Sequence, residues 1–219
     1  VLLLGSGGRE NAIAWIIKKS TKLKKLFIAP GNHGTSLLGE NVKLDISNFE
    51  NIQEFIVKEQ IKLLIVGPEQ PIVEGIYDYL RALFNSEELI IIAPSKLGGA
   101  LEGSKKFAKE FMEKYNIPNA KYKTFNKNKF NEAIDYLKTL SPPYVLKADG
   151  LAAGKGVVIS NKTSEAKDAL HKMLIENQFG EASDTVLIEE FLDGIELSVF
   201  VLTNGKDYKI LPVAKDYKR

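Results

Sequence analysis

Apolar runs alternate with helix-like segments over roughly the first 95 residues, and this alternation limits the fold more than any other feature of the chain. Runs such as Leu63–Val66 and 89–93 are apolar without interruption, which is typical of strands covered on both faces. Strands separated by helices form parallel sheets. The sequence therefore predicts an α/β domain with a parallel sheet and a domain boundary near residue 100, where Gly98 and Gly99 interrupt the pattern.

Three helices are predicted in this region. Residues 9–19 place Ala12, Trp15 and Ile16 on one helical face, and further helices are expected around 49–59 and at 72–84.

The region after residue 100 has a different pattern. Ser104 is expected to cap a helix in which Phe107, Phe111 and Tyr115 recur every four residues, and we expect these aromatic side chains in the core. Strands without strict helix alternation follow, and residues 196–213 predict a hairpin that turns at an Asn-Gly pair. This half is expected to be α+β with antiparallel strand pairs.

The composition is that of a globular protein in a reducing compartment. The chain has 219 residues, a net charge of +2 with both signs mixed, and no cysteine, so disulfides and thiolate metal sites are excluded. Its apolar runs are too short to span a bilayer. We expect a cytoplasmic protein without nucleic-acid or membrane partners. Because Val1 already lies in a strand, we also expect residues to be missing before it.

A glycine-rich loop at 5–10 (GSGGRE) follows the first strand and opens a helix, a place where backbone N–H groups favour an anion. The dinucleotide-binding fingerprint fits poorly, because its third glycine falls on Glu10 and no acidic residue follows the second strand, which ends in PGN at 30–32. A phosphate or substrate site is favoured, and a tight turn without a ligand remains open.

A second glycine-rich loop, KADGLAAGKG at 147–156, is the most informative stretch. It is one residue too short for a P-loop, and Gly156 stands where the Mg²⁺-binding hydroxyl belongs. A flexible loop between two strands, preceded by Lys147, fits a lid over the phosphates of ATP. Lys155 is as well explained by solvation alone.

Two further segments fit the same reading. Residues 189–196 (EEFLDGIE) run from a strand into a linker whose backbone groups could read an adenine edge, with a carboxylate for ribose hydroxyls. Lys105 stands at a helix start, where the helix dipole disfavours a cation, and this placement indicates a functional role. An ordinary surface lysine remains open there. The two histidines, His33 and His171, are not expected to form a metal pair.

The order of these segments is that of ATP-grasp enzymes, and six blocks resemble the phosphoribosylamine–glycine ligase family, also called glycinamide ribonucleotide synthetases. The blocks are GSGGRENAIAW at 5–15, APGNHGT at 29–35, VGPEQPIVEG at 66–75, LEGSK at 101–105, KADGLAAGKG at 147–156 and EEFLDGIE at 189–196. One departure is Asn11, where the family often has His.

The resemblance implies a fold and a domain organisation. Residues 1–100 would form a Rossmann-like, pre-ATP-grasp domain that binds substrate, and 101–219 an incomplete ATP-grasp domain whose lid subdomain covers about 121–190. The chain would be only the N-terminal half of the enzyme. The family's metal ligands would lie in the other half, and this half alone is expected to be inactive.

The resemblance also implies an activity: ATP-dependent joining of glycine to 5-phosphoribosylamine through a glycyl phosphate, in purine biosynthesis. The expected small molecules are ATP, glycine, 5-phosphoribosylamine and Mg²⁺ or Mn²⁺, and a monomer is expected. Lys105 and Lys147 would bind phosphates, and Glu196 the ribose.

The implied ATP-binding residues are Lys105, Lys147, Gly150, Gly154, Lys155, Gly156, Glu189, Glu190, Phe191, Leu192 and Glu196. The implied substrate-facing residues are Gly7, Gly8, Arg9, Glu10, Asn32, Glu69, Asp216, Lys218 and Arg219.

The same residues allow a comparison with three other functions. A different ATP-grasp carboxylate–amine ligase or carboxylase would share the ATP chemistry, but the loop at 5–10 and the PGN turn argue against another acceptor. A non-catalytic nucleotide-binding module is disfavoured by the retention of both phosphate lysines. A Rossmann oxidoreductase lacks the third glycine and the ribose carboxylate.

Overall fold

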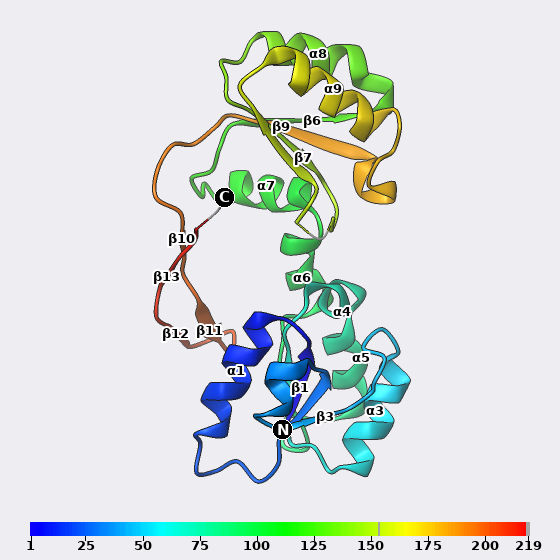
Figure 1. Ribbon diagram of the computed structural model, residues 1–219, viewed down its shortest axis with the longest axis vertical. Coiled ribbons are helices and arrows are strands. Elements are labelled where there is room, and N and C mark those ends of the chain that lie inside the picture. Colours follow the sequence, from blue (N-terminus) through cyan, green and yellow to red (C-terminus); the bar gives the residue numbers. More distant parts are fainter. Residues whose placement is uncertain (153, 218–219) are drawn as a thin grey trace.

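The protein has two lobes joined through α6 (Lys96–Gly103) and α7 (Lys105–Lys114), as the computed structural model in Figure 1 shows. The structure describes residues 1–152 and 154–217. Residue 100, where the domain boundary is predicted, lies inside α6. Among the described residues, no helix combines the length and the apolar character needed to cross a membrane.

The first lobe is built on a five-stranded sheet with the order β3-β2-β1-β4-β5. Every neighbouring pair runs parallel, which confirms the predicted parallel α/β sheet. The strands are β1 (Leu2–Gly5), β2 (Phe27–Pro30), β3 (Glu40–Asn41), β4 (Leu63–Val66) and β5 (Ile90–Ile92).

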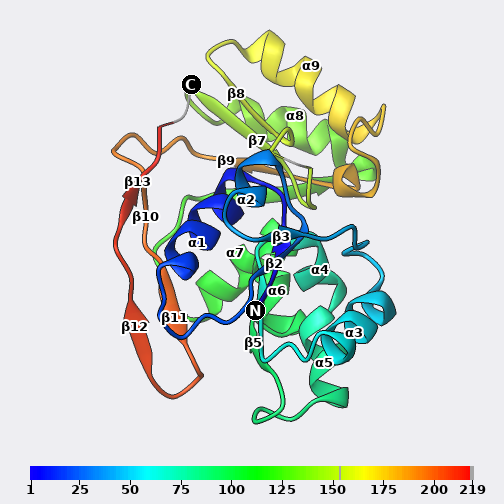
Figure 2. The ribbon, with the colours of Figure 1, turned by 60° about the horizontal axis from the view of Figure 1, so that its bottom comes forward.

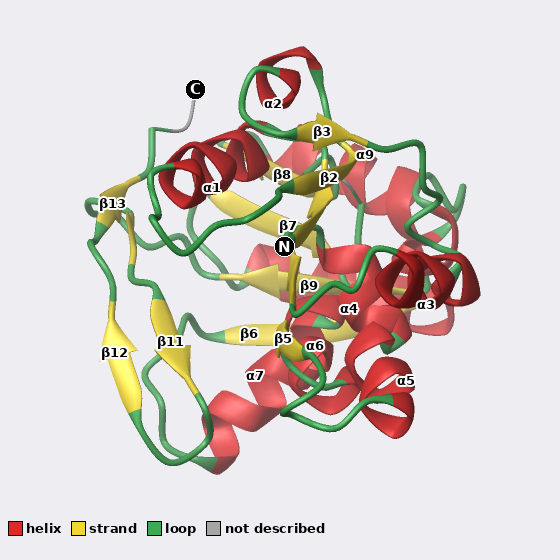
Figure 3. Cartoon of the chain, turned by 90° about the horizontal axis from the view of Figure 1, so that it is seen from below, coloured by secondary structure: helices red, strands yellow, loops and turns green. Residues whose placement is uncertain are grey.

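Helices cover both faces of this sheet (Figure 3). Successive side chains of a strand point to opposite faces, so Leu2 and Leu4 pack with α3 and α5 on one face, whereas Leu3 packs with α1 on the other. The helices of this lobe before α6 are α1 (Gly8–Lys18), α2 (His33–Ser36), α3 (Phe49–Lys58), α4 (Glu69–Glu74) and α5 (Ile76–Leu83).

Glycines explain two differences from the predicted helices. The single helix predicted at 72–84 is two helices, because Gly75 adopts φ 101°, a left-handed conformation that ends α4. Gly98 and Gly99 do not interrupt the chain but lie inside α6. A Cβ on Gly99 would approach Ile72 to 2.7 Å, so this glycine allows α6 to pack closely on α4.

The apolar face predicted for α1 is not the buried one. Trp15 and Ile16 are exposed, and Ala14 is the residue of this helix that enters the core cluster, beside the half-buried Ile13 and Ile17. The ammonium of Lys19 covers the Trp15 ring at 3.1 Å from its centroid. The apolar spacing therefore predicted the helix correctly, but not which of its faces packs on the sheet.

The second lobe contains a four-stranded antiparallel sheet with the order β6-β9-β7-β8, as expected for an α+β region. Helices α8 and α9 cover one face, and α7 lies on the other side (Figure 1). The elements are β6 (Tyr122–Asn126), α8 (Phe130–Lys138), β7 (Tyr144–Ala148), β8 (Val157–Ser160), α9 (Thr163–Leu174) and β9 (Thr185–Glu189), with short 3-10 turns at Lys127–Lys129 and Gly180–Ser183.

The aromatic residues of α7 are not core residues, contrary to the prediction. Phe107 and Phe111 are half-buried, and Tyr115 is exposed and contacts Phe111 at a tilt of 49°, with 4.6 Å between ring centroids. The side chain that α7 buries is Lys109. Ser104 does cap the helix, accepting a hydrogen bond from the Phe107 N–H, as predicted.

The last segment forms an arm that stands apart from both sheets (Figures 1 and 2). The predicted hairpin is present, with β11 (Val201–Thr203) antiparallel to β12 (Tyr208–Ile210). Nearer the second lobe, β10 (Leu197–Ser198) pairs with β13 (Ala214–Lys215). Most side chains of the arm are exposed, including apolar ones such as Phe200.

The separate cores of the two lobes lead to a prediction. Leu64 and Leu146 are fully buried in different clusters. Leu146→Ala should lower the stability of the second lobe by about 2–5 kcal/mol, because a cavity remains where the side chain was. Urea unfolding followed by circular dichroism should then show two steps, of which Leu146→Ala shifts one and Leu64→Ala the other. A single transition that both variants shift equally would contradict two independently folded lobes.

Candidate active site

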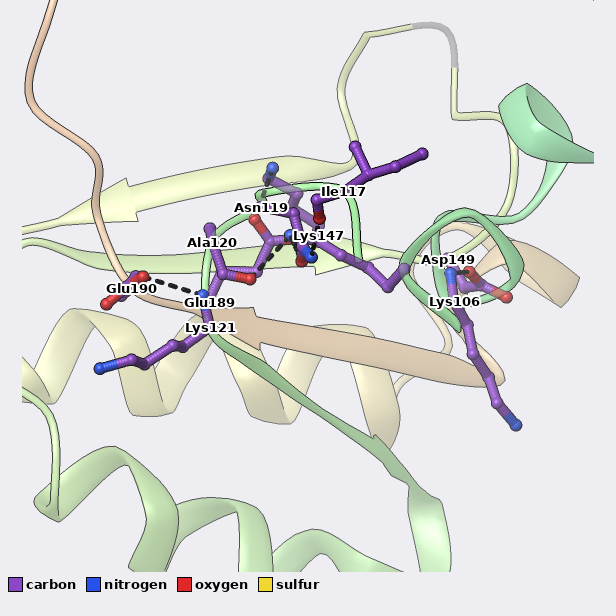
Figure 4. Close-up of polar contacts among 10 residues, drawn as sticks. Lys106, Ile117, Asn119, Ala120, Lys121, Lys147, Asp149, Glu189 and Glu190 are labelled. Atoms are coloured by element: carbon purple, nitrogen blue, oxygen red, sulfur yellow. Dashed lines mark hydrogen bonds and ion pairs between the residues drawn. The ribbon is translucent and has the colours of Figure 1, made fainter. Parts of the chain in front are cut away.

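The site in the second lobe is centred on an ion pair between two adjacent strands. Lys147 of β7 and Glu189 of β9 are diagonal neighbours, because the register pairs Lys147 with Leu187 and Val145 with Glu189. Both side chains lie on the face opposite α8 and α9. The Lys147 Nζ donates a hydrogen bond of 2.8 Å to Glu189 Oε2. Residues 42 positions apart thus meet directly, as Figure 4 shows.

The Glu189 carboxylate is almost fully removed from solvent, with 4% of its side chain exposed. A buried carboxylate is stable as an anion only with positive charge beside it. Its second oxygen, Oε1, forms an ion pair with Lys109 Nζ at 3.6 Å. Within residues 1–152 and 154–217, no group donates a hydrogen bond to Oε1. Glu189 therefore has a lysine on each oxygen.

Two lysines of α7 are held in a partly dehydrated place. Burial lowers the pKa of Lys109 against the opposing effect of Glu189, and burial likewise lowers the pKa of Lys105 against the effect of Asp149. The Lys105 Nζ donates to the backbone carbonyls of Asp149 (3.2 Å) and Gly150 (3.1 Å). Because both acceptors are neutral, the Lys105 ammonium can exchange them for an anion.

Asp149 ties the glycine-rich loop to the start of α7. Its carboxylate accepts a hydrogen bond of 2.6 Å from the Lys106 N–H (Figure 4). It also accepts bonds of 3.0 and 3.1 Å from the Ser104 hydroxyl. A carboxylate is favoured at a helix N-terminus by the unpaired N–H groups and the helix dipole. Asp149 therefore fixes the first residue of the loop, a role that the sequence did not assign to it.

The rest of the loop varies in how tightly it is packed. Gly150 packs against Ala182 and Gly156 against Ala152, where an added Cβ would come within 3.0 Å. Gly154 has φ 76° and open space around it, and Lys155 is exposed. The loop is thus packed near its two ends, whereas Gly154 and Lys155 are exposed.

The segment after β9 positions the other predicted ATP-binding residues. The Glu190 carboxylate accepts a hydrogen bond of 2.9 Å from the Lys121 N–H, so it is directed to β6 rather than to Lys147 (Figure 4). Phe191 and Leu192 are 41% and 64% exposed, and Glu196 is exposed before the arm. These side chains are accessible to a ligand.

The predicted substrate residues of the first lobe meet where β1, β2 and β4 end. The Asn32 amide donates 2.8 Å to the Ser6 carbonyl, and Arg9 Nη1 donates 2.9 Å to both the Gly67 carbonyl and Glu69 Oε1. Ligands of open α/β sheets bind at such an edge. Although burial opposes it, hydrogen bonds from its own N–H and from Arg9 lower the pKa of Glu69.

Glu10, which the sequence assigned to the substrate site, is buried at this edge against Gly5 and Gly67, at the ends of β1 and β4. The residue is 5% exposed, and its carboxylate accepts a hydrogen bond of 2.6 Å from the Gly7 N–H. A Cβ on Gly5 or Gly67 would overlap its side chain. Gly7 is thus held by Glu10, whereas Gly8 is exposed at the start of α1. Glu10 shapes the loop and leaves the N–H groups beyond it for a ligand.

The last predicted substrate residues lie in the arm. Asp216 accepts a hydrogen bond of 3.1 Å from the Ser198 hydroxyl, across the β10–β13 pair. Lys218 and Arg219 lie outside the described residues.

Besides Asp149, the sequence analysis left three residues of this site unassigned. Lys109 follows Lys105 by four residues, which places both on one helical face, and this spacing was the available signal. Val157 and Ile159 of β8 are exposed on the same sheet face as Lys147, and Val157 is paired with Lys147 in the register. No three His, Asp or Glu side chains of the described ranges come together in a way that could hold a metal ion.

The fold and this site define a class: the second lobe, with its antiparallel sheet and lysine–glycine loop, is an ATP-grasp domain. The chain belongs to the phosphoribosylglycinamide synthetase family. Residues 1–102 match the family's "Phosphoribosylglycinamide synthetase, N domain", and residues 103–219 match its "ATP-grasp (A) domain".

Individual relatives agree with this. The chain is 43% identical over 221 residues to phosphoribosylamine–glycine ligase of Pseudomonas syringae pv. tomato and 44% identical over 220 residues to that of Fusobacterium nucleatum. Each alignment covers 100% of this chain and 50% of the relative. The chain thus spans about half the length of these curated relatives.

Solved structures extend the comparison. The crystal structure of phosphoribosylamine–glycine ligase from Thermotoga maritima has a TM-score of 0.75 and 34% identity, covering 100% of this chain and 50% of that one. D-Alanine–D-alanine ligase from Helicobacter pylori has a TM-score of 0.61 and 17% identity, covering 100% of this chain and 75% of that one, which shows a shared fold.

The Asp149 contacts make the first prediction for this site. Asp149→Ala should destabilise the second lobe by about 1–3 kcal/mol, because the Lys106 N–H and the Ser104 hydroxyl lose their acceptor. Urea denaturation measures the change. The matched control is Asp135→Ala, whose exposed ion pair with Lys138 should change stability by less than about 0.5 kcal/mol. Equal stabilities of the two variants would show that Asp149 does not anchor the loop.

Proposed function

We propose that this chain is the substrate-binding and nucleotide-binding part of a phosphoribosylamine–glycine ligase, which joins glycine to 5-phosphoribosylamine at the expense of ATP in purine biosynthesis. The observation that carries the proposal is the meeting of Lys105, Lys147 and the glycine-rich loop above a buried glutamate. The names of its relatives support the particular substrates.

The phosphates of ATP would lie between the two phosphate lysines and the loop. Lys105 now donates to neutral carbonyls and Lys147 to Glu189, so both ammonium groups can turn to an incoming polyanion. Gly154, with open space at its Cα, lets backbone N–H groups approach the phosphates. Gly150, Lys155 and Gly156 belong to the same proposed cradle.

The base and the ribose would occupy the apolar side of the same sheet face. Val157 and Ile159 present exposed side chains next to Lys147, and Phe191 and Leu192 lie exposed after β9. An apolar wall with nearby backbone donors and acceptors suits an adenine ring. Glu189, Glu190 and Glu196 are the proposed polar contacts of the base and the ribose.

Phosphoribosylamine would bind at the edge of the first sheet. Its phosphate fits the exposed N–H groups that start α1 at Gly8, with the Arg9 guanidinium beside them. Asn32 and Glu69 would bind its hydroxyl and amine groups. Asp216, Lys218 and Arg219 stay proposed contacts of the same substrate, and Glu10 supports the loop from behind.

The proposed reaction has two steps. A carboxylate oxygen of glycine attacks the γ-phosphorus of ATP, and the bond to the β,γ-bridging oxygen breaks, giving glycyl phosphate and ADP. The amine nitrogen of 5-phosphoribosylamine then attacks the carbonyl carbon, loses a proton and expels inorganic phosphate. The residues described here bind and orient ATP and the amine, and their ammonium groups screen phosphate charge.

The remaining parts of the proposal concern the whole protein. Mg²⁺ or Mn²⁺ would neutralise phosphate charge, but the described residues offer no set of ligands for it, so no step is assigned to the ion here. We propose domains at 1–100 and 101–219, with a lid at about 121–190, and a monomer in the cytoplasm. The alternative is a non-catalytic nucleotide-binding module, which glycine-dependent release of ADP by the whole protein would exclude.

Lys147 provides the direct test of the nucleotide site. In the whole natural protein, Lys147→Ala should weaken ATP binding about tenfold or more, since a phosphate loses a charge-assisted hydrogen bond. Isothermal titration measures the affinity, with Lys172→Ala on the surface of α9 as the matched control. An unchanged ATP affinity in Lys147→Ala would remove Lys147 from the site.

Arg9 provides the test of the acceptor site. Arg9→Ala should raise the KM for phosphoribosylamine about tenfold or more while leaving the KM for ATP unchanged. The Arg9 guanidinium lies at the edge of the first sheet and not at the second glycine-rich loop, at 147–156. Glycine-dependent release of ADP by the whole protein measures both constants. An increase confined to ATP would show that the two sites are assigned to the wrong lobes.

A further inference from the structure

We infer that Lys109 is a positioning residue: it stays on the Glu189 carboxylate as a permanent counterion and so releases Lys147 for the phosphates of the nucleotide. The inference rests on the proposed ATP site and adds to it a residue that contacts no phosphate. It starts from the arrangement already described, in which two lysines share one buried carboxylate.

The two lysines are not equivalent. Lys147 has 29% of its side chain exposed, whereas Lys109 has 9%. The Lys109 Nζ also donates to the Ala120 carbonyl at 3.0 Å and to the Asn119 amide oxygen at 3.3 Å. Its ammonium lies 5.3 Å from the centroid of the Tyr122 ring. Lys109 is therefore fixed by several groups that a nucleotide does not displace, and Lys147 is the lysine that can move.

The electrostatic cost of moving Lys147 depends on Lys109. When Lys147 turns from Glu189 to a phosphate, the carboxylate, whose side chain is 4% exposed in this structure, loses a hydrogen bond of 2.8 Å. A buried carboxylate left without a cation is strongly unfavourable. With Lys109 in place, positive charge remains at 3.6 Å on the other oxygen. The geometry thus allows Lys147 to exchange its partner without leaving an unpaired charge.

Without Lys109, we consequently expect Lys147 to stay paired with Glu189 rather than to turn to the phosphates. In Lys109→Met the apolar stem of the side chain is replaced by one of similar length, but Lys147 becomes the single lysine bonded to Glu189 among the described residues. A nucleotide must then break that pair and leave Glu189 uncompensated. Glu189→Gln removes this requirement, because a carboxamide needs no counterion.

The experiment is a double-mutant cycle in the whole natural protein, with the fluorescent analogue methylanthraniloyl-ATP as the probe and displacement by ATP as the specificity check. Lys109→Met should weaken binding about tenfold or more, because binding now uncovers a buried charge. Lys109→Met with Glu189→Gln should bind within about threefold of Glu189→Gln alone. Lys114→Met, at the exposed end of the same helix, should bind like the natural protein.

The outcomes separate the two proposals. If the natural protein does not bind the analogue, both the proposed ATP site and this inference are wrong. Binding by the natural protein together with unchanged binding by Lys109→Met would overturn the inference alone. Strictly additive losses in the cycle would also overturn it, because Lys109 would then act on stability rather than through Glu189. If Lys109→Met does not fold, the comparison of the double variant with Glu189→Gln still decides.

Discussion

The buried carboxylate of Glu189 imposes the strongest constraint on this molecule. An anion with 4% of its side chain exposed must be surrounded by positive charge, and the register of β7 and β9 brings Lys147 to it. Helix α7 has to pack on the same sheet face to bring Lys109 to the second oxygen. One charge thus links two strands and one helix, and of the two lysines that compensate it Lys147 is the more exposed.

The same helix links that charge to the glycine-rich loop. The start of α7 holds Asp149, and Lys105 in its first turn donates to the loop carbonyls. A movement of the Lys105 ammonium would therefore change the hydrogen bonds at the first residues of the loop. In the first lobe the parallel strands end together and bring the candidate residues into contact, and Glu10 fixes the glycine-rich loop through the Gly7 N–H.

Local patterns in the sequence predicted much of the fold and of the candidate site. They did not predict the features that depend on how the elements pack. Uninterrupted apolar strands gave the parallel sheet, and the lysine–glycine spacing gave the loop, because both are properties of neighbouring residues. Spacing could not tell that the Trp15 face of α1 is exposed, since the side of a helix that meets a sheet is decided by the rest of the chain. Lys109 was missed for the same reason: a lysine on a helix is usually solvated, and its burial appears only once β9 places Glu189 beneath it.

The most direct measurement is a crystal structure of the whole natural protein with a non-hydrolysable ATP analogue. If the two lysines of Glu189 divide their roles as inferred, Lys147 Nζ will lie within hydrogen-bond distance of a phosphate oxygen while Lys109 remains on Glu189. An analogue bound elsewhere, with the Lys147–Glu189 bond of 2.8 Å intact, would contradict the assignment of this site.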